Sequence, residues 1–282
     1  MIKYWGYLSS IVTATAIGAL VIFLAVNAIS GVSFTLFFGD SKPLDAILGK
    51  VTVWNGLWSP LLGTLRLLSL TGLFVIPMGL AVGMYASEYA SGKRERLVTA
   101  ILESLAGIPS IIMGLFGFTL ILILRRYIFS ANTCMLLAAF CLALLALPVL
   151  SLNTYAALKG VPSNVRLTAA SLGMSKETAI VRIFVPVAGE GIFSGLLLSA
   201  ARCAEDAAVI LLTGAVAGAG NITGIFDKFE ALPFFIYYVS ANYQNEVQLA
   251  QVFAAAILLL AITTALFTFG TVLKNKSRLW MR

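Results

Sequence analysis

Three charged side chains lie within one otherwise apolar segment, and their types and spacing could bind an anion or carry a proton. They are Arg202, Glu205 and Asp206. Because residues three or four positions apart share one face of an α-helix, Arg202 can form an ion pair with Asp206, and Glu205 can compete for it. A guanidinium offers a planar fork of donors that suits oxyanions, and a carboxylate in such a segment can serve as a proton site. The segment is therefore a candidate translocation site, and an internal salt bridge that only neutralises charge is the alternative interpretation.

The chain around these residues has the composition of a membrane protein. Of its 282 residues, 60% are hydrophobic and 11% are charged, against about 45–50% and about 25% in soluble domains. A helix needs about 20 mainly apolar residues to cross a bilayer. We expect an all-α polytopic membrane protein in which residues 1–282 form a single transmembrane domain. The six expected spans are residues 10–30, 62–86, 99–124, 133–153, 190–216 and 247–272.

The basic residues indicate how these spans are oriented. Loops that are rich in lysine and arginine tend to stay in the cytoplasm. If the N-terminus is cytoplasmic, most of the 19 basic residues fall on the inside. Those that fall on the outside are Lys42, Lys50, Arg125, Arg126 and Lys228. The pattern favours both termini in the cytoplasm, and the apolar run 11–29 is too long for a cleaved signal sequence.

Several other kinds of function are disfavoured. The net charge of +7 is spread over short loops, so topology explains it better than nucleic-acid binding. The chain has no histidine, and its three cysteines lie in apolar segments without CxxC spacing, so we expect no metal site and no cofactor bound by this chain. The glycine-rich segment 214–221 lacks the lysine of a phosphate-binding loop. We therefore expect the chain not to be an enzyme.

The loop at residues 154–189 is the most informative polar segment. Ser163 or Asn164 can cap a short helix that runs to Leu172, and Ser175 can cap a second helix that stops near Pro186. Both helices are amphipathic, so their apolar face needs a partner or must lie on lipid headgroups. The apolar positions are Ala169, Leu172, Ile180, Ile183 and Phe184.

The same loop resembles a signature of ABC importer permeases, written EAA-x3-G-x9-I-x-LP. Ala169, Gly173, Ile183 and Pro186 stand at matching positions. Leu167 and Thr168 replace the glutamate and the first alanine of the signature, and Val185 replaces its leucine. The resemblance implies that a separate ATPase subunit docks on this loop.

A second segment is similar to one branch of that family, the permeases of phosphate importers. The run from Glu103 to Phe116 resembles their third-span pattern E-x-LAGIPSIVxGLF. Pro109 should kink or break this span, and Gly114 and Gly117 should allow close approach of another helix. The residues that carry the match are Glu103, Gly107, Pro109, Ser110 and Gly114.

The fifth span also follows this branch, with departures at the charged residues. The segment 202–209 aligns with the family pattern R-A-L-G-E-T-A-P, so Arg202 is kept, Asp206 replaces the glutamate and Glu205 replaces the glycine. Segments 191–198 and 231–237 resemble the PstA-type permease as well, and the likeness covers roughly residues 61–272. The resemblance implies phosphate as the substrate. Because of the extra carboxylate, sulfate and molybdate are alternative substrates.

The resemblance implies a type I ABC importer permease fold in the cytoplasmic (inner) membrane. Its implied partners are membrane lipid, a PstC-like second permease, two PstB-like ATPase subunits that bind ATP with magnesium, and an extracytoplasmic PstS-like phosphate-binding protein. A proton-coupled secondary transporter that uses Glu205 or Asp206 is the rival from another class. Inverted repeats would support that rival, and the sequence shows no convincing internal repeat.

Overall fold

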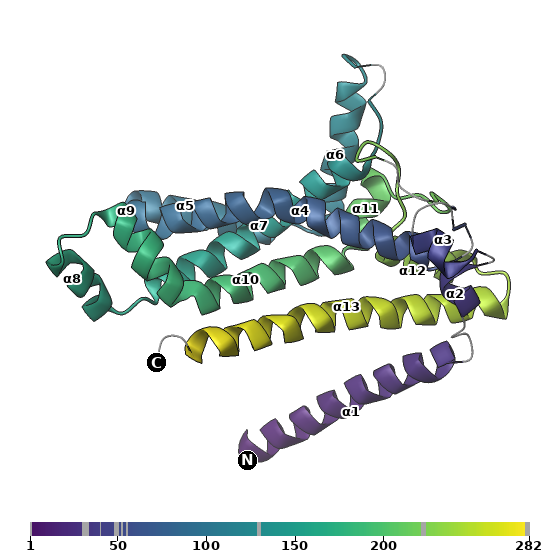
Figure 1. The fold of residues 1–282 in the computed structure, drawn as a ribbon, viewed down its shortest axis with the longest axis horizontal. Coiled ribbons are helices and arrows are strands. Elements are labelled where there is room, and N and C mark those ends of the chain that lie inside the picture. The colour runs from purple at the N-terminus through teal and green to yellow at the C-terminus, as the bar shows by residue number, and fades with distance from the viewer. Residues whose placement is uncertain are drawn as a thin grey trace. The chain divides into compact units, whose positions relative to one another are not determined.

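The computed structural model describes residues 2–29, 34–39, 41–47, 51, 53, 54, 56–128, 131–220 and 224–279. Helices dominate these residues (Figure 1). Two π-helical turns, η1 and η2, each continue an α-helix. The elements are α1 (Ile2–Ile29), α2 (Phe34–Phe38), α3 (Pro43–Ile47), α4 (Trp58–Met84), η1 (Tyr85–Tyr89), α5 (Lys93–Ala106), α6 (Ser110–Leu124), α7 (Met135–Lys159), α8 (Ser163–Ser171), α9 (Lys176–Ala179), η2 (Ile180–Phe184), α10 (Val185–Glu205), α11 (Ala207–Thr213), α12 (Leu232–Asn242) and α13 (Glu246–Leu279).

Within the described ranges, five helices are long and apolar enough to cross a membrane. They cover Tyr4–Ala28, Trp58–Tyr89, Met135–Lys159, Lys176–Glu205 and Glu246–Thr268. The helices α5 and α6 form a sixth candidate span if this bent pair is counted as one. The all-α polytopic prediction is thus confirmed, and every expected span has a helical counterpart.

The chain divides into two compact units. The first is built from residues within 1–63, 216–222 and 229–262. Its apolar core joins Ala28 of α1, Leu57 and Leu232 to Ala254 and Ala255 of α13. The second unit takes residues within 64–215, 223–228 and 263–282, and it holds all the candidate site residues. The expectation of one functional transmembrane domain stays a prediction.

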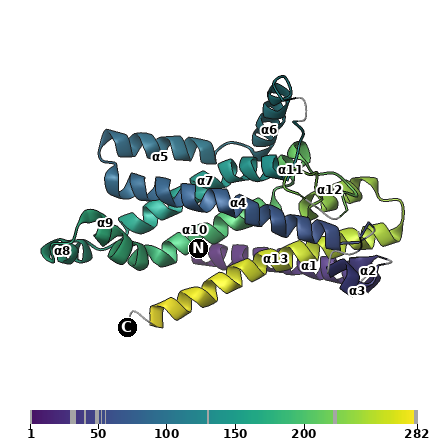
Figure 2. The same cartoon turned by 45° about the horizontal axis from the view of Figure 1, so that its top comes forward.

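Helix α7 forms the core of the second unit. It is 67% buried over its most apolar stretch, against 28% or less for the other candidate spans. Glycines let its neighbours approach closely: a Cβ on Gly83 of α4 would lie 2.6 Å from the Cβ of Thr154, and one on Gly191 of α10 would lie 2.6 Å from the Cβ of Ala157. As a result α4, α7 and α10 run side by side (Figures 1 and 2).

The expected third span, 99–124, is not one straight helix. Helix α5 ends at Ala106 and α6 begins at Ser110, with an angle of 91° between them. Pro109 adopts an extended conformation (φ −60°, ψ 137°) just before α6, and a proline cannot donate the backbone hydrogen bond that a continuous helix needs. The prediction that Pro109 kinks or breaks the span is confirmed.

The helix at the expected fifth span, 190–216, has other bounds. The helix begins at Lys176 and ends at Glu205, and α11 is a separate helix. The second loop helix therefore does not stop at Pro186. This proline is the second residue of α10, which directly follows the π-helical turn η2, and a wide turn of this kind accommodates an interrupted backbone ladder.

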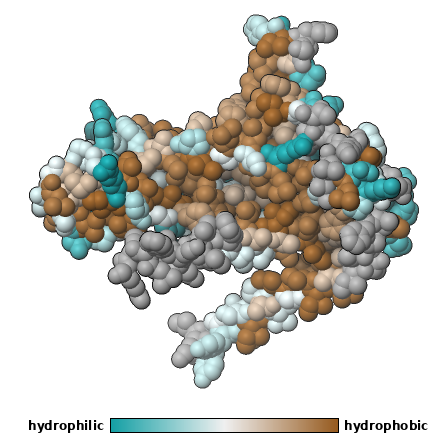
Figure 3. Space-filling model, viewed as in Figure 1, coloured by the Kyte–Doolittle hydropathy of each residue, from teal (hydrophilic) through white to brown (hydrophobic). Residues whose placement is uncertain are grey.

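Apolar side chains cover much of the surface of the second unit (Figure 3). Those on α6 include Ile112, Leu115, Phe116 and Ile123, each about half exposed. An apolar surface of this kind is unfavourable in water and is expected where lipid or another membrane subunit covers the helix.

Candidate functional site

The three charged residues of the fifth span lie where that span breaks. Arg202 and Glu205 are exposed in the last turn of α10, and Asp206 is the single residue between α10 and α11. The ion pairs found among the described residues join Lys159 to Glu95 and Arg166 to Glu88. The pairing of Arg202 with Asp206 that the spacing predicts is therefore absent from the described structure, and Glu205 does not replace Asp206 in it.

The reason lies in the backbone at Asp206. Its φ of −79° and ψ of 101° are not helical, so Arg202 and Asp206 no longer share a helical face. The carboxylate instead accepts a hydrogen bond from the backbone N–H of Val209 at 2.9 Å. This contact caps the first turn of α11 and satisfies a donor that has no partner within the helix.

The third-span motif places α6 against α11. Gly107 ends α5, Pro109 forms the bend and Ser110 begins α6. A Cβ on Gly114 would lie 2.9 Å from the carbonyl oxygen of Ala208, so only glycine allows this approach without a shift. The motif and the charged segment thus meet through α6 and α11, whereas Glu103 is exposed on α5 and lies outside this junction.

Gly117 makes a second close approach on the same helix. A Cβ there would lie 2.6 Å from the Sγ atom of Cys141 and 2.7 Å from the Cγ2 atom of Thr213. The prediction that Gly114 and Gly117 allow close helix packing is confirmed. Both glycines act in packing, and neither offers a side chain to a substrate.

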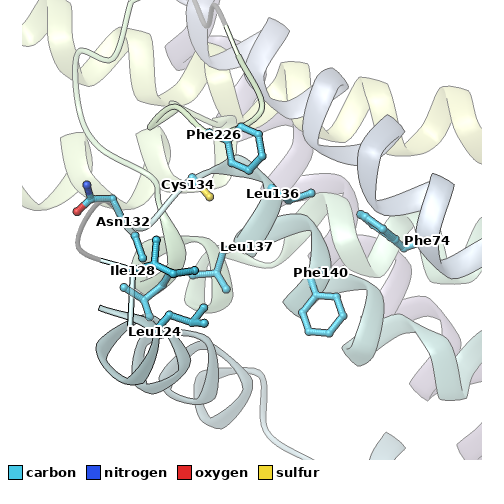
Figure 4. A pocket seen from close by; sticks show the side chains of 11 residues that line it. Phe74, Leu124, Ile128, Asn132, Cys134, Leu136, Leu137, Phe140 and Phe226 are labelled. Atoms are coloured by element: carbon cyan, nitrogen blue, oxygen red, sulfur yellow. The ribbon is translucent and has the colours of Figure 1, made fainter. Parts of the chain in front are cut away.

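A cavity of about 550 Å³ lies beside α6 and α7, but its chemistry does not suit an oxyanion (Figure 4). Its walls are almost wholly apolar, and Asn132 is the one lining residue with a polar side chain apart from a cysteine. Asn132 accepts a hydrogen bond from Arg125. No charged residue lines this cavity, so we place no anion site in it. The lining residues are Phe74, Ile121, Leu124, Ile128, Ala131, Asn132, Cys134, Leu136, Leu137, Phe140 and Phe226.

The loop signature has a clear structural basis at Gly173. Helix α8 ends at Ser171, and Gly173 follows with a φ of +68°, a conformation that favours glycine. The backbone N–H of Gly173 bonds to the carbonyl of Ala170, and that of Met174 bonds to the carbonyl of Ala169. This pair of bonds is the Schellman motif that closes many helices. Ser175 then caps α9 as predicted, by accepting a bond from the N–H of Thr178 at 3.3 Å.

The N-terminal cap of α8 differs from the prediction. The helix begins at Ser163, with Pro162 in the capping position and no side-chain capping bond. A proline is favourable beside the first turn because its missing N–H is not needed there.

Most of the predicted apolar face of the loop packs inside the chain. Ala169, Ile180 and Phe184 are buried in a cluster with Leu158 of α7, and Ile183 packs against it half-buried. The interior of the second unit is therefore the partner of this face. Pro186 and Gly173 are exposed.

A different set of apolar loop residues stays open. Leu167 and Val181 are each 67% exposed, and Leu172 is 71% exposed. Leu172 was predicted to share one apolar face with Ala169, but it is the C-terminal cap of α8 and lies outside the buried cluster. These three residues are the open apolar positions that a partner of the loop could cover.

Sequence reasoning missed two ion pairs between helices near the loop. Arg166 of α8 binds Glu88 of η1, and Lys159 of α7 binds Glu95 of α5, with N–O distances of 2.8 Å. Each pair joins residues more than 60 positions apart in the chain. Residue spacing gives no signal for such pairs.

The fold and the loop together define a class of protein, the ABC importer permease. The chain superposes on a chain of a bacterial alginate ABC transporter with a TM-score of 0.64 at 16% identity, covering 95% of this chain and 94% of the other. An inward-facing MetNI methionine ABC transporter gives a TM-score of 0.61 at 16% identity, covering 84% of this chain and 99% of the other. The fold is therefore the type I ABC importer permease fold.

The chain belongs to the family of binding-protein-dependent transport system inner membrane components, which it matches over residues 76–279. It is 32% identical to the phosphate transport system permease protein PstA 1 of Mycobacterium tuberculosis strain CDC 1551 / Oshkosh, over 74% of this chain and 68% of the relative. It is also 32% identical to PstA of Haemophilus influenzae, over 76% of this chain and 74% of the relative. A probable ABC transporter permease of Bacillus subtilis, YqgI, is 26% identical over 74% of this chain and 67% of the relative. The chain is thus a multi-pass inner-membrane permease component.

Proposed function

We propose that the chain is a permease subunit of an ATP-driven importer that moves inorganic phosphate across the cytoplasmic membrane into the cell. The names of the PstA relatives support phosphate as the substrate. The exposed guanidinium of Arg202, which is paired with neither Glu205 nor Asp206 in the described structure, supports an oxyanion, because it keeps its donors free for phosphate oxygens. Glu205 lies beside it and lowers the local positive charge, so its effect on the choice of oxyanion is part of the test.

The observation that carries the proposal is the helix pair at residues 163–184. One face of this pair is packed on the interior of the second unit, while Leu167, Leu172 and Val181 remain open. A docking surface needs helices that are held in place on one side and that expose apolar side chains on the other. We infer that an ATPase subunit, which binds ATP with magnesium, docks on these residues.

We infer the remaining partners from the likeness to the phosphate permeases. They are a PstC-like second permease, a second copy of the PstB-like ATPase and a PstS-like phosphate-binding protein outside the cell. Both termini lie in the cytoplasm in this proposal, on the side of the ATPase. Alternative substrates are sulfate and molybdate.

The first experiment is co-purification of the tagged chain in mild detergent, with identification of the proteins that it retains. An ATPase should accompany the wild-type chain, and Leu172→Asp should lose it, because a charge would then face the apolar contact. Tyr127→Asp is the matched control, since Tyr127 is 83% exposed in the turn that follows α6. Recovery of the intact chain without an ATPase would refute the proposal.

The second experiment measures which anion is transported and by what energy source. Cells that express the chain with its partners should take up labelled phosphate, and unlabelled phosphate should compete better than sulfate or molybdate. Uptake should survive a protonophore while ATP is maintained. Uptake that a protonophore abolishes under these conditions would instead favour the proton-coupled transporter.

A further inference from the structure

The side chain of Arg166 joins four elements at the base of the loop. Its Nη1 and Nη2 atoms donate to the two carboxylate oxygens of Glu88, each at 2.8 Å. Nη2 also donates to the carbonyl oxygen of Leu158 at 2.7 Å, and the guanidinium lies over the Phe184 ring, 4.6 Å from its centroid. Ser87 donates to Glu88 at 2.9 Å. Arg166 thereby connects α8 to η1, α7 and η2.

The geometry of this contact is that of a rigid link. Both carboxylate oxygens are engaged by the two guanidinium nitrogens, an arrangement that fixes orientation as well as distance. The Glu88 side chain is only 4% exposed, and that of Arg166 is 31% exposed. The hydrogen bonds that Arg166 donates to the Glu88 carboxylate raise the pKa of Arg166. The pair is thus charged and partly shielded from solvent, so movement of α8 must either carry η1 with it or break a partly buried ion pair.

The two π-helical turns of the described structure meet at this link. Glu88 lies in η1 at the end of α4, and Phe184 lies in η2 at the start of α10. Turns of this type are rare and occur often at functional sites, because the wider backbone allows a local change in the helix. Arg166 touches both turns, so a displacement of α8 would act on α4 and α10 at the positions where each is least regular.

We propose that the Arg166–Glu88 pair is a positioning pair that transmits movement of the loop to α4. This inference rests on the proposed function, in which an ATPase moves the loop. Neither residue touches the substrate or ATP in this role. The pair is needed to couple ATP hydrolysis to transport, and it is not needed to hold the ATPase.

A second ion pair in the same unit provides a matched control. Lys159 binds Glu95 at 2.8 Å, with side-chain exposures of 42% and 23%, and Tyr155 donates to Glu95 at 2.6 Å. This pair joins α7 to α5, and none of its described contacts reaches α8. Because exposed ion pairs usually contribute little, breaking it should leave coupling unchanged.

The test uses the complete complex, reconstituted in liposomes, and measures phosphate transported per ATP hydrolysed. Arg166→Gln should retain the ATPase on co-purification and lower this ratio about tenfold, a change within the range of typical coupling between sites. Arg166→Lys should be intermediate, since it keeps the charge and loses the planar fork. The double variant Glu88→Gln/Arg166→Gln should transport no less phosphate per ATP than either single variant. Lys159→Gln should have the wild-type ratio.

Each outcome separates this inference from the proposed function. A wild-type complex that retains its ATPase, together with an Arg166→Gln complex of normal ratio, overturns the link and leaves the importer intact. An equal loss in Lys159→Gln also overturns it, because a general weakening of the unit would then explain the loss. If the Arg166→Gln complex is recovered poorly, Arg166→Lys is measured instead. A wild-type ratio of phosphate to ATP in that variant also overturns the proposed link. Absence of an ATPase from the wild type overturns both proposals.

Discussion

The side chain of Asp206 accepts a hydrogen bond from the backbone N–H of Val209 at 2.9 Å, one residue after α10 ends. This bond separates the fifth span into two helices. Because the Asp206 carboxylate makes this bond, it does not pair with Arg202. The N–H groups of the Arg202 guanidinium therefore stay available to another acceptor. The break thus supports the role that we propose for Arg202.

Replacement of Asp206 by alanine should destabilise the start of α11. Loss of a capping side chain typically costs about 1 kcal/mol, so the thermal midpoint of the purified protein in detergent should fall by a few degrees. Asp206→Asn should retain most of the stability, because its amide oxygen can accept the same bond. Glu205→Ala is the control, since Glu205 is exposed and is not the capping residue. Equal midpoints for Asp206→Ala and the wild type would contradict the capping role.

Replacement of Gly114 by alanine should disturb the packing of α6 on α11. The added Cβ would lie 2.9 Å from the Ala208 carbonyl oxygen and 3.2 Å from the Val209 Cα atom, and backbone atoms cannot move aside easily. Overpacking of this kind costs about 1–3 kcal/mol. The matched control is Gly189→Ala on α10, where no atom lies within 4 Å of the added Cβ. The comparison is made by thermal unfolding in detergent, and a loss of similar size in both variants would contradict the packing argument.

Replacement of Arg202 by alanine should abolish most transport without disassembling the complex. Hydrogen bonds to charged groups contribute about 1.5–3 kcal/mol, so phosphate uptake should fall at least about tenfold. Stability should change little, because Arg202 is exposed and has no ion pair in the described structure. Arg126→Ala, at an exposed position after α6, should transport normally. Normal uptake by an assembled Arg202→Ala complex would exclude Arg202 from the path.

Glu230 should make the stability of the protein depend on pH. Burial raises its pKa to about 7, although a hydrogen bond from the Gly218 backbone N–H partly opposes this. Between about pH 4.5 and 7 the folded state keeps a proton that the unfolded state releases, so stability falls as the pH rises through this window. A change of one pKa unit corresponds to about 1.4 kcal/mol, so the total effect is at most about 3 to 4 kcal/mol.

The test for Glu230 is thermal unfolding of the wild type and of Glu230→Gln from pH 5 to 8. The glutamine variant cannot ionise, so its advantage over the wild type should grow as the pH rises and level off above pH 7. Parallel profiles for the two proteins would show that Glu230 is not the group responsible.

The sequence by itself determined the class of fold and most of the helices. Runs of about 20 apolar residues are sufficient to predict transmembrane helices, because backbone groups in lipid must be satisfied within the segment. Local signals also located Pro109 at the bend, Ser175 at the cap of α9 and Gly173 at the end of α8. These features depend on backbone chemistry within a few residues, which sequence records directly.

The tertiary structure alone decided how the charged and apolar side chains are used. Spacing predicted a pair between Arg202 and Asp206, but a single non-helical residue changes which side chains share a face. The apolar face of the loop is covered by α7, and Leu172 is left exposed, which depends on how distant segments pack. Arg166 and Glu88 lie 78 positions apart in the chain and meet only because α8 folds back onto the end of α4. Contacts between distant residues depend on the whole fold, so local patterns do not predict them.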